Sequence, residues 1–168
     1  IHCLEPNADL HDKIQKRVHF HKNLIIHKLG AGVKDEELSF YKSTHHESNS
    51  FLKNWGHRLG NPVPEEIVSI SRIDTFCSKN GIDSISILKT NAEGFDFQIL
   101  QGAASLLNQK KILCVLVEVS FGNLGAESAT PGDYINLMES HGYQFVGLYE
   151  IARNKSGGIM WGNMLFVV

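Results

Sequence analysis

The sequence predicts an α/β fold in three layers, with a mostly parallel sheet and an antiparallel last strand. Apolar runs alternate with amphipathic helical segments along most of the 168 residues, as they do in successive βαβ units. Residues 112–119 form a nearly continuous apolar run, which is typical of a parallel strand covered on both faces. The last two apolar runs are joined without a helix, so we expect them to pair antiparallel.

The first half of the chain predicts strands at residues 1–4, 24–29, 38–41 and 67–70. Asn7 can cap a helix whose apolar residues recur at fourfold spacing. Ile73, Phe76 and Cys77 predict a short helix that ends near Gly81. Gly30, Ala31 and Gly32 form a predicted turn. Residues 43–64 are polar and irregular, and long loops of this kind tend to be functional.

The second half predicts strands at residues 84–89, 112–119, 143–149 and 160–168. A helix after the first of these strands carries apolar residues from Phe95 to Leu106 on one face. Thr130 caps another predicted helix, which has Pro131 at its first position and Gly142 at its end.

The composition excludes several classes of protein. The 16 Lys and Arg against 18 Asp and Glu leave no broad basic face, so we expect no nucleic-acid partner. Because no apolar run approaches the roughly 18 residues of a membrane-spanning helix, we also expect no membrane partner. The three cysteines are an odd number and lie far apart, which argues against a disulfide scaffold and favours reduced thiols in the cytoplasm.

The chain opens at Ile1 inside a predicted strand, without an initiator methionine. We therefore expect residues 1–168 to be a single domain that is incomplete at its N-terminus. A homodimer that covers exposed strand edges is one arrangement open to such a chain.

Functional side chains are expected just after the strands, because ligands of open α/β sheets bind beyond the carboxyl ends of the strands. Glu5 follows the first strand and could accept hydrogen bonds from both hydroxyls of a ribose. It could equally be a solvated carboxylate that favours the start of the next helix. The small residues Gly30 and Ala31 could let a flat ring approach the backbone, although a plain turn explains them as well.

The stretch after the strand at residues 84–89 is the most informative. Lys89 ends an apolar strand, and Asn91 could offer both a donor and an acceptor to a ligand. Glu93 has the chemistry of a proton acceptor, but a carboxylate in the first turn of a helix also favours the helix dipole. Glu118 lies near the end of the next strand. It is a further candidate for a functional carboxylate, although it could also be the partner of a nearby Lys or of a backbone donor.

The nine histidines raise the question of a metal site. His19 and His21 would share one side of an extended segment, and His45 and His46 are adjacent, but none of them forms a specific ligand pattern. We therefore expect no metal. His57 in the long loop is retained as a candidate base.

Short motifs in a fixed order resemble those of the FkbM-type methyltransferases, which depend on S-adenosyl-L-methionine. They are LEPN at residues 4–7, RID at 72–74, LKTNAEGFD at 88–96, LQGA at 100–103, VE at 117–118, GY at 142–143 and NMLFV at 163–167. Each motif is short, but together they cover the whole chain at the spacing of the family.

The resemblance implies a class I methyltransferase fold, which is Rossmann-like, with strand order 3-2-1-4-5-7-6. It also implies S-adenosyl-L-methionine as the cofactor and the hydroxyl oxygen of a sugar or another small molecule as the methyl acceptor. Carried over by position, the residues implied to bind the cofactor are Glu5, Pro6, Gly30 and Ala31. Asn91 and Glu93 would flank the transferring methyl group, and Lys89 and Glu118 would contact the small-molecule substrate.

Two departures from the family pattern leave an alternative open. Asn91 stands where the family has Asp, and the family's first strand and glycine-rich loop have no counterpart in the sequence. The alternative is a degenerate or truncated methyltransferase-like protein without activity. An oxidoreductase that binds a dinucleotide would also explain Glu5, but the antiparallel pair at the end of the chain argues against it.

Overall fold

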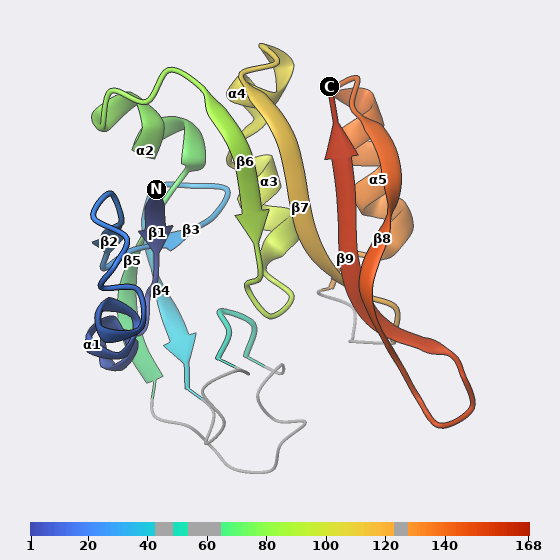
Figure 1. Cartoon of the computed structure of the whole chain (residues 1–168), viewed down its shortest axis with the longest axis horizontal. Coiled ribbons are helices and arrows are strands. Elements are labelled where there is room, and N and C mark those ends of the chain that lie inside the picture. The colour runs from blue at the N-terminus through green and yellow to red at the C-terminus, as the bar shows by residue number, and fades with distance from the viewer. Residues whose placement is uncertain (43–48, 54–64, 123–127) are drawn as a thin grey trace.

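Strands and helices alternate along the computed structural model, which describes residues 1–42, 49–53, 65–122 and 128–168 (Figure 1). The strands are β1 (His2–Leu4), β2 (Ile25–His27), β3 (Gly30–Ala31), β4 (Glu36–Tyr41), β5 (Glu65–Ser71), β6 (Ile85–Thr90), β7 (Ile112–Ser120), β8 (Gln144–Arg153) and β9 (Ile159–Val167). The helices are α1 (Ala8–Arg17), α2 (Ile73–Lys79), α3 (Asp96–Gln101), α4 (Ala104–Asn108) and α5 (Pro131–Ser140). The predicted α/β class is confirmed.

The described strands form three separate sheets, with orders β1-β2, β3-β5-β4 and β6-β7-β9-β8. The pairs β1/β2, β3/β5 and β6/β7 are parallel, whereas β4/β5, β7/β9 and β8/β9 are antiparallel. The prediction of a mostly parallel sheet is therefore wrong. A short connection accounts for one of these antiparallel pairs, because β8 and β9 are joined by a tight turn without a crossover helix.

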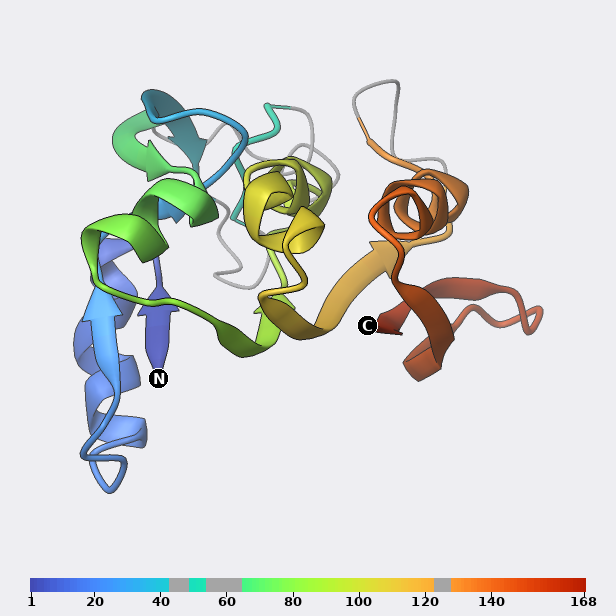
Figure 2. The ribbon, with the colours of Figure 1, turned by 90° about the horizontal axis from the view of Figure 1, so that it is seen from above.

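The largest sheet is covered by helices on one face. Seen from above, α3, α4 and α5 lie over the same side of the sheet β6-β7-β9-β8 (Figure 2). Val115, Val117 and Val119 alternate along β7 and are fully buried on this side, against Leu100 and Met138. In the part of the chain that the structure describes, no helix lies over the other face, so the expected third layer is not seen there.

The caps of the two longest helices follow the sequence prediction. The Asn7 side chain accepts from the Asp9 amide at the start of α1 and is itself almost fully buried. Thr130 and Asp133 form a capping box at the start of α5, with Pro131 in the first turn. The hairpin formed by β8 and β9 confirms the antiparallel pair expected at the end of the chain.

The helix predicted from Phe95 to Leu106 is divided into α3 and α4. Gly102 lies between them, and a Cβ at this position would collide with the carbonyl oxygen of Gly32. Asp74 caps α4 from outside the helix, because its carboxylate accepts from the amides of Ser105 at 3.1 Å and Leu106 at 3.0 Å. Close approach of two backbones therefore requires glycine at the point where the two helices meet.

The turn predicted at Gly30 to Gly32 is instead the short strand β3, which pairs in parallel with the end of β5. A Cβ on Gly30 would meet the side chain of Ile70 at 2.5 Å and that of Phe51 at 2.7 Å. Packing against these side chains is thus what requires glycine here.

In the described residues the cysteines Cys3, Cys77 and Cys114 are free; Cys77 is buried and the other two are partly buried. A search of the described residues finds no helix that is long and apolar enough to cross a membrane.

Candidate active site

A cavity of about 700 Å³ opens between β1 and β6, at the ends of several strands. Among its lining residues are seven that the sequence singled out: Glu5, Pro6, Gly30, Ala31, Lys89, Asn91 and Glu93. They come from the ends of β1 and β6 and from β3, which are far apart in the sequence. The cavity has the size of the sites that hold cofactors and other small ligands.

The strands β1 and β6, which border the cavity, each pair with one neighbouring strand in the described residues. Within the described residues, β1 pairs with β2 and β6 pairs with β7, and no strand lies between β1 and β6. The arrows of β1 and β6 point in the same direction (Figure 1). The space between them therefore borders two parallel strand edges, and Ile1 and Leu88 line it from the two sides.

Glu5 is fixed at the carboxyl end of β1. Its backbone amide donates to the carbonyl of His27 at 3.0 Å, and its Oε1 accepts from the Asn7 amide at 2.7 Å. Partial burial raises the pKa of the Glu5 carboxyl, and the Asn7 amide opposes the rise. One carboxylate oxygen thus holds the start of α1, so the two interpretations of Glu5 are compatible.

The turn after β6 presents Asn91 and Glu93 to the cavity. Glu93 has a φ of 49° and Gly94 a φ of 88°, so the backbone is left-handed at both positions. The buried Asp96 carboxylate holds the turn, because both of its oxygens lie 3.1 Å from the Ala92 amide. Burial raises the pKa of Asp96 to about 6 against the effect of these hydrogen bonds. A left-handed non-glycine residue held in this way is typical of functional turns.

Ser50 is a lining residue that the sequence did not single out. Its hydroxyl donates to the carbonyl oxygen of Glu93 at 2.8 Å and accepts from the Leu52 amide at 3.0 Å. Backbone hydrogen bonds between Ser50 and Tyr41 attach the same segment to the end of β4. The segment therefore connects β4 to the turn after β6. In the sequence, the position of residues 49–53 within the long polar loop was the one signal for such a role.

Glu118 does not line the cavity itself, but it is hydrogen-bonded to Asn91, which does. The Asn91 Nδ2 donates to Glu118 Oε2 at 3.0 Å, which joins the end of β6 to the end of β7. Burial raises the pKa of Glu118 to about 7, and the nearby carboxylates of Glu93 and Asp96 raise it further, whereas Lys89 lowers it. An acidic group with this pKa can gain and lose a proton near neutral pH.

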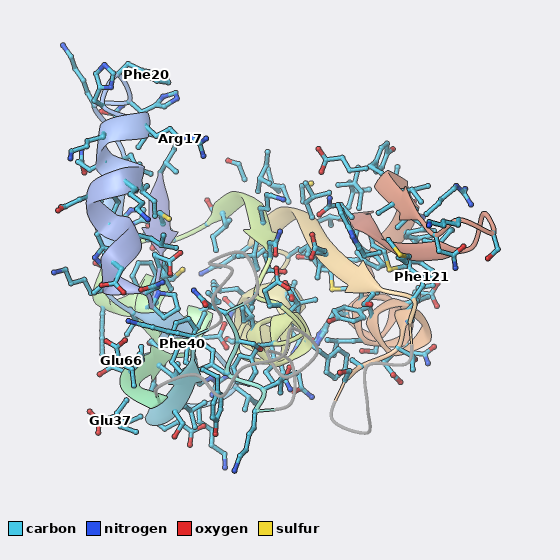
Figure 3. The ribbon with its side chains drawn as sticks, turned by 90° about the horizontal axis from the view of Figure 1, so that it is seen from below. Arg17, Phe20, Glu37, Phe40, Glu66 and Phe121 are labelled. Atoms are coloured by element: carbon cyan, nitrogen blue, oxygen red, sulfur yellow. The ribbon has the colours of Figure 1, made fainter. Side chains whose placement is uncertain are left out.

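The histidines that the sequence singled out lie outside the cavity or outside the described residues. His57 lies outside the described residues, so its proposed role as a base stays a prediction. His19 and His21 flank the exposed Phe20, which projects beyond Arg17 and the end of α1 (Figure 3). In the described ranges, no group of three or more His, Cys, Asp or Glu side chains could hold a metal ion.

Known proteins provide an independent comparison. A family model described as the methyltransferase FkbM domain matches residues 2–145 of the chain. The fold is similar to the crystal structure of methyltransferase FkbM from Methylobacillus flagellatus KT, with a TM-score of 0.58 and 16% sequence identity. That match covers 100% of this chain and 36% of the other, so the chain spans little more than a third of the relative's length.

No sequence among the curated proteins is significantly similar to the chain. At 16% identity, the structural match shows the fold alone. The family model covers most of the sequence, including the motifs around Glu5 and Asn91 and the cavity that they line. The chain belongs to the FkbM methyltransferase family.

Proposed function

We propose that this protein is a methyltransferase that uses S-adenosyl-L-methionine and methylates the hydroxyl oxygen of a sugar or another small molecule. The observation that carries the proposal is the cavity between β1 and β6, which collects residues of the family motifs from both halves of the chain. Family membership supports methyl transfer as the reaction. The choice of an oxygen acceptor rests on the general chemistry of the family.

The residues around the cavity fit a nucleoside cofactor. At about 700 Å³ the cavity is large enough for such a molecule. Glu5 is half-buried at its edge, and a carboxylate at the end of a strand can accept hydrogen bonds from a ribose diol. Ala31 is a small buried residue that lines the cavity beside Gly30. Glu5, Pro6, Gly30 and Ala31 are therefore the residues that would hold the cofactor.

When bound, the cofactor supplies an electrophilic methyl group on a positively charged sulfur. The protein's own part is to align the acceptor oxygen and to take up one proton. Asn91 and Glu93 line the cavity from the turn after β6, where they can orient an acceptor, and Lys89 lines it from the same strand.

A further part of the proposal concerns the space between β1 and β6. In the active protein we expect a parallel strand there, because both neighbouring edges can form ladder hydrogen bonds with it. A glycine-rich loop at the carboxyl end of that strand would reach the cavity beside Glu5 and Asn91. Such a strand would join the sheets of β1 and β6 into one.

Calorimetry with S-adenosylhomocysteine tests the function. We would titrate it into the chain itself and into the chain preceded by a strand and a glycine-rich loop of the family type. Tighter binding by the longer chain is expected. We also expect Glu5→Gln to weaken that binding at least tenfold, while Glu37→Gln on the exposed side of β4 leaves it unchanged. If neither chain binds, the protein is an inactive homologue.

A further inference from the structure

Asn163 on β9 carries a buried oxygen that lacks a hydrogen-bond donor in the described part of the chain. The residue is 2% exposed, and its Nδ2 donates to Glu150 Oε2 at 2.6 Å. Its Oδ1 is buried and has no hydrogen-bond partner among the described residues. Because buried polar atoms in folded proteins are nearly always paired, a donor for this oxygen is expected.

Glu118 stands directly opposite Asn163 in the antiparallel ladder of β7 and β9. Side chains that are opposite in such a ladder share a face, with Cβ atoms about 4.5–5.5 Å apart. An ionised carboxylate can only accept hydrogen bonds, but a protonated one has an O–H group to donate. A proton on Glu118 would therefore supply the donor that the Asn163 Oδ1 lacks.

Glu150 determines which end of the Asn163 amide is left for Glu118. It lies in the irregular part of β8 between Tyr149 and Ala152, and its φ of 50° is left-handed. Irregularities of this kind re-aim side chains and often occur beside active sites. Since the Nδ2 of Asn163 is held by the Glu150 carboxylate, the Oδ1 is the end that remains.

On its other side, Glu118 is joined to the cavity by Asn91, whose Nδ2 donates to Oε2 at 3.0 Å. Glu118 is half-buried and does not itself line the cavity, so the proposal places the methyl acceptor beside Asn91, next to the Glu118 carboxylate. Glu118 thus lies between an amide that lines the cavity and an amide that is buried.

We propose that Glu118 takes up the proton of the methyl acceptor, and that the protonated carboxyl then donates to the Oδ1 of Asn163. This inference rests on the proposed methyltransferase function. In the overall transfer, the O–H bond of the acceptor and the sulfur–methyl bond break, and an O–methyl bond forms. The sulfonium becomes a neutral thioether, and the proton goes to Glu118. Asn163 is a positioning residue, because it acts through Glu118.

The charges around Glu118 agree with this role. The carboxylates that face it are Glu93 in the turn after β6, Asp96 on α3 and Glu150 on β8, whereas Lys89 on β6 is the cation that opposes them. Together with burial, which contributes most, they raise the pKa of Glu118 to about 7. A proton acceptor is most effective when its pKa lies near the working pH.

Carbon-13 NMR of the full chain with labelled glutamate and asparagine side chains tests the hydrogen bond without cofactor or substrate. Glu118→Gln identifies the Glu118 carboxyl signal. In the wild type we expect that signal to titrate near neutral pH, and the side-chain carbonyl carbon of Asn163 to follow the same curve. Asn163→Ala should lower the titration midpoint, while Gln144→Ala, at the opposite end of β8, should leave it unchanged. A raised or unchanged midpoint in Asn163→Ala, or an Asn163 carbon that does not respond, overturns the proposal.

Turnover tests the proton transfer itself. With hydroxylated small molecules such as neutral sugars as acceptors, we expect Glu118→Gln to lower kcat about 100-fold or more while S-adenosylhomocysteine still binds. Asn163→Ala should shift the pH profile of kcat in the direction of the NMR midpoint. If Glu118→Gln remains active and Glu93→Gln does not, Glu93 is the proton acceptor. A chain that fails to bind S-adenosylhomocysteine refutes the proposed function, and the NMR result is independent of that outcome.

Discussion

Asn91 donates its side-chain amide to the carboxylate of Glu118 at 3.0 Å, across the ends of β6 and β7. The two strands are parallel neighbours in one sheet, so their carboxyl ends lie at the same edge. Asn91 also lines the cavity, and it therefore connects that cavity to the carboxylates around Glu118. An amide at this position can donate to the carboxylate, which an ionised Asp could not do.

The raised pKa of Glu118 predicts a pH dependence of stability. The pKa is about 7 in the folded chain and ordinarily 4.5, so the folded state favours the protonated form. The stability that comes from protonated Glu118 is fully present below pH 4.5 and is lost as the pH rises through about 7. Between pH 5 and pH 8 we expect Glu118→Gln to lose about 1–2 kcal/mol less free energy of unfolding than the wild type, allowing for solvent screening of a half-exposed group.

Urea unfolding at the two pH values measures this effect, with Glu139→Gln on the exposed side of α5 as the control. A smaller dependence remains in the variant, because burial also raises the pKa of Asp96, to about 6. If the free energy of unfolding changes equally between the two pH values in the wild type and in Glu118→Gln, the pKa of Glu118 is not raised by folding.

Asn91→Asp would place a second carboxylate against Glu118. Two carboxylates at hydrogen-bond distance share one proton, so the pKa of the pair rises further. We expect the variant to lose more stability than the wild type between pH 5 and pH 8, by about 1 kcal/mol after screening. Urea unfolding is the measurement, and Asn136→Asp on the exposed side of α5 controls for the added charge. A variant with unchanged pH dependence would contradict the close contact.

Gly102→Ala should destabilise the fold by about 1–3 kcal/mol, because the added Cβ collides with the carbonyl oxygen of Gly32. Thermal unfolding is the measurement. Gly132→Ala in α5 is the matched control, since its Cβ would meet nothing nearer than the Thr130 hydroxyl at 3.7 Å. That change should be neutral or slightly stabilising, because alanine favours a helix. Equal effects of the two changes would argue against the backbone contact.

Asp74→Ala removes the carboxylate that caps α4 through the amides of Ser105 and Leu106. Loss of a helix cap costs about 0.5–2 kcal/mol, and we expect the upper half of this range because two amides lose their acceptor. Chemical denaturation checks the effect, with the exposed Asp83→Ala for comparison. The prediction fails if the two variants unfold at the same denaturant concentration.

Ser50→Ala separates the segment at residues 49–53 from the turn that carries Glu93. The hydroxyl is buried and both donates and accepts, so its loss should cost about 1–2 kcal/mol. We also expect weaker binding of S-adenosylhomocysteine, since the same turn lines the cavity. Ser140→Ala, at the exposed end of α5, should affect neither stability nor binding. Unchanged binding in Ser50→Ala would show that the segment does not position the turn.

Much of the local structure could be read from the sequence, because local chemistry decides it. Asn7 and Thr130 cap their helices as predicted, since a side-chain oxygen at this position satisfies a free amide whatever the tertiary context. The continuous apolar run at residues 112–119 predicted a strand, as observed, but burial alternates along it and Leu113 is exposed, so the prediction that both faces are covered is wrong. Position at the ends of strands also identified Glu5, Asn91 and Glu93 as cavity residues, since the carboxyl ends of parallel strands share an edge.

Tertiary structure decided what depends on contacts between distant segments. Gly102 has no room for a side chain because the backbone of Gly32 approaches it, and no local sequence pattern predicts that approach. Ser50 joins the turn at Glu93 through a hydrogen bond across 43 positions, and Asn163 meets Glu118 only because β9 returns beside β7. The sequence by itself determined the family, the helix caps and the strand ends that carry the candidate residues. The packing of strands that are distant along the chain decided which of those residues are in contact. It also decided which carboxylates lie close enough to raise one another's pKa.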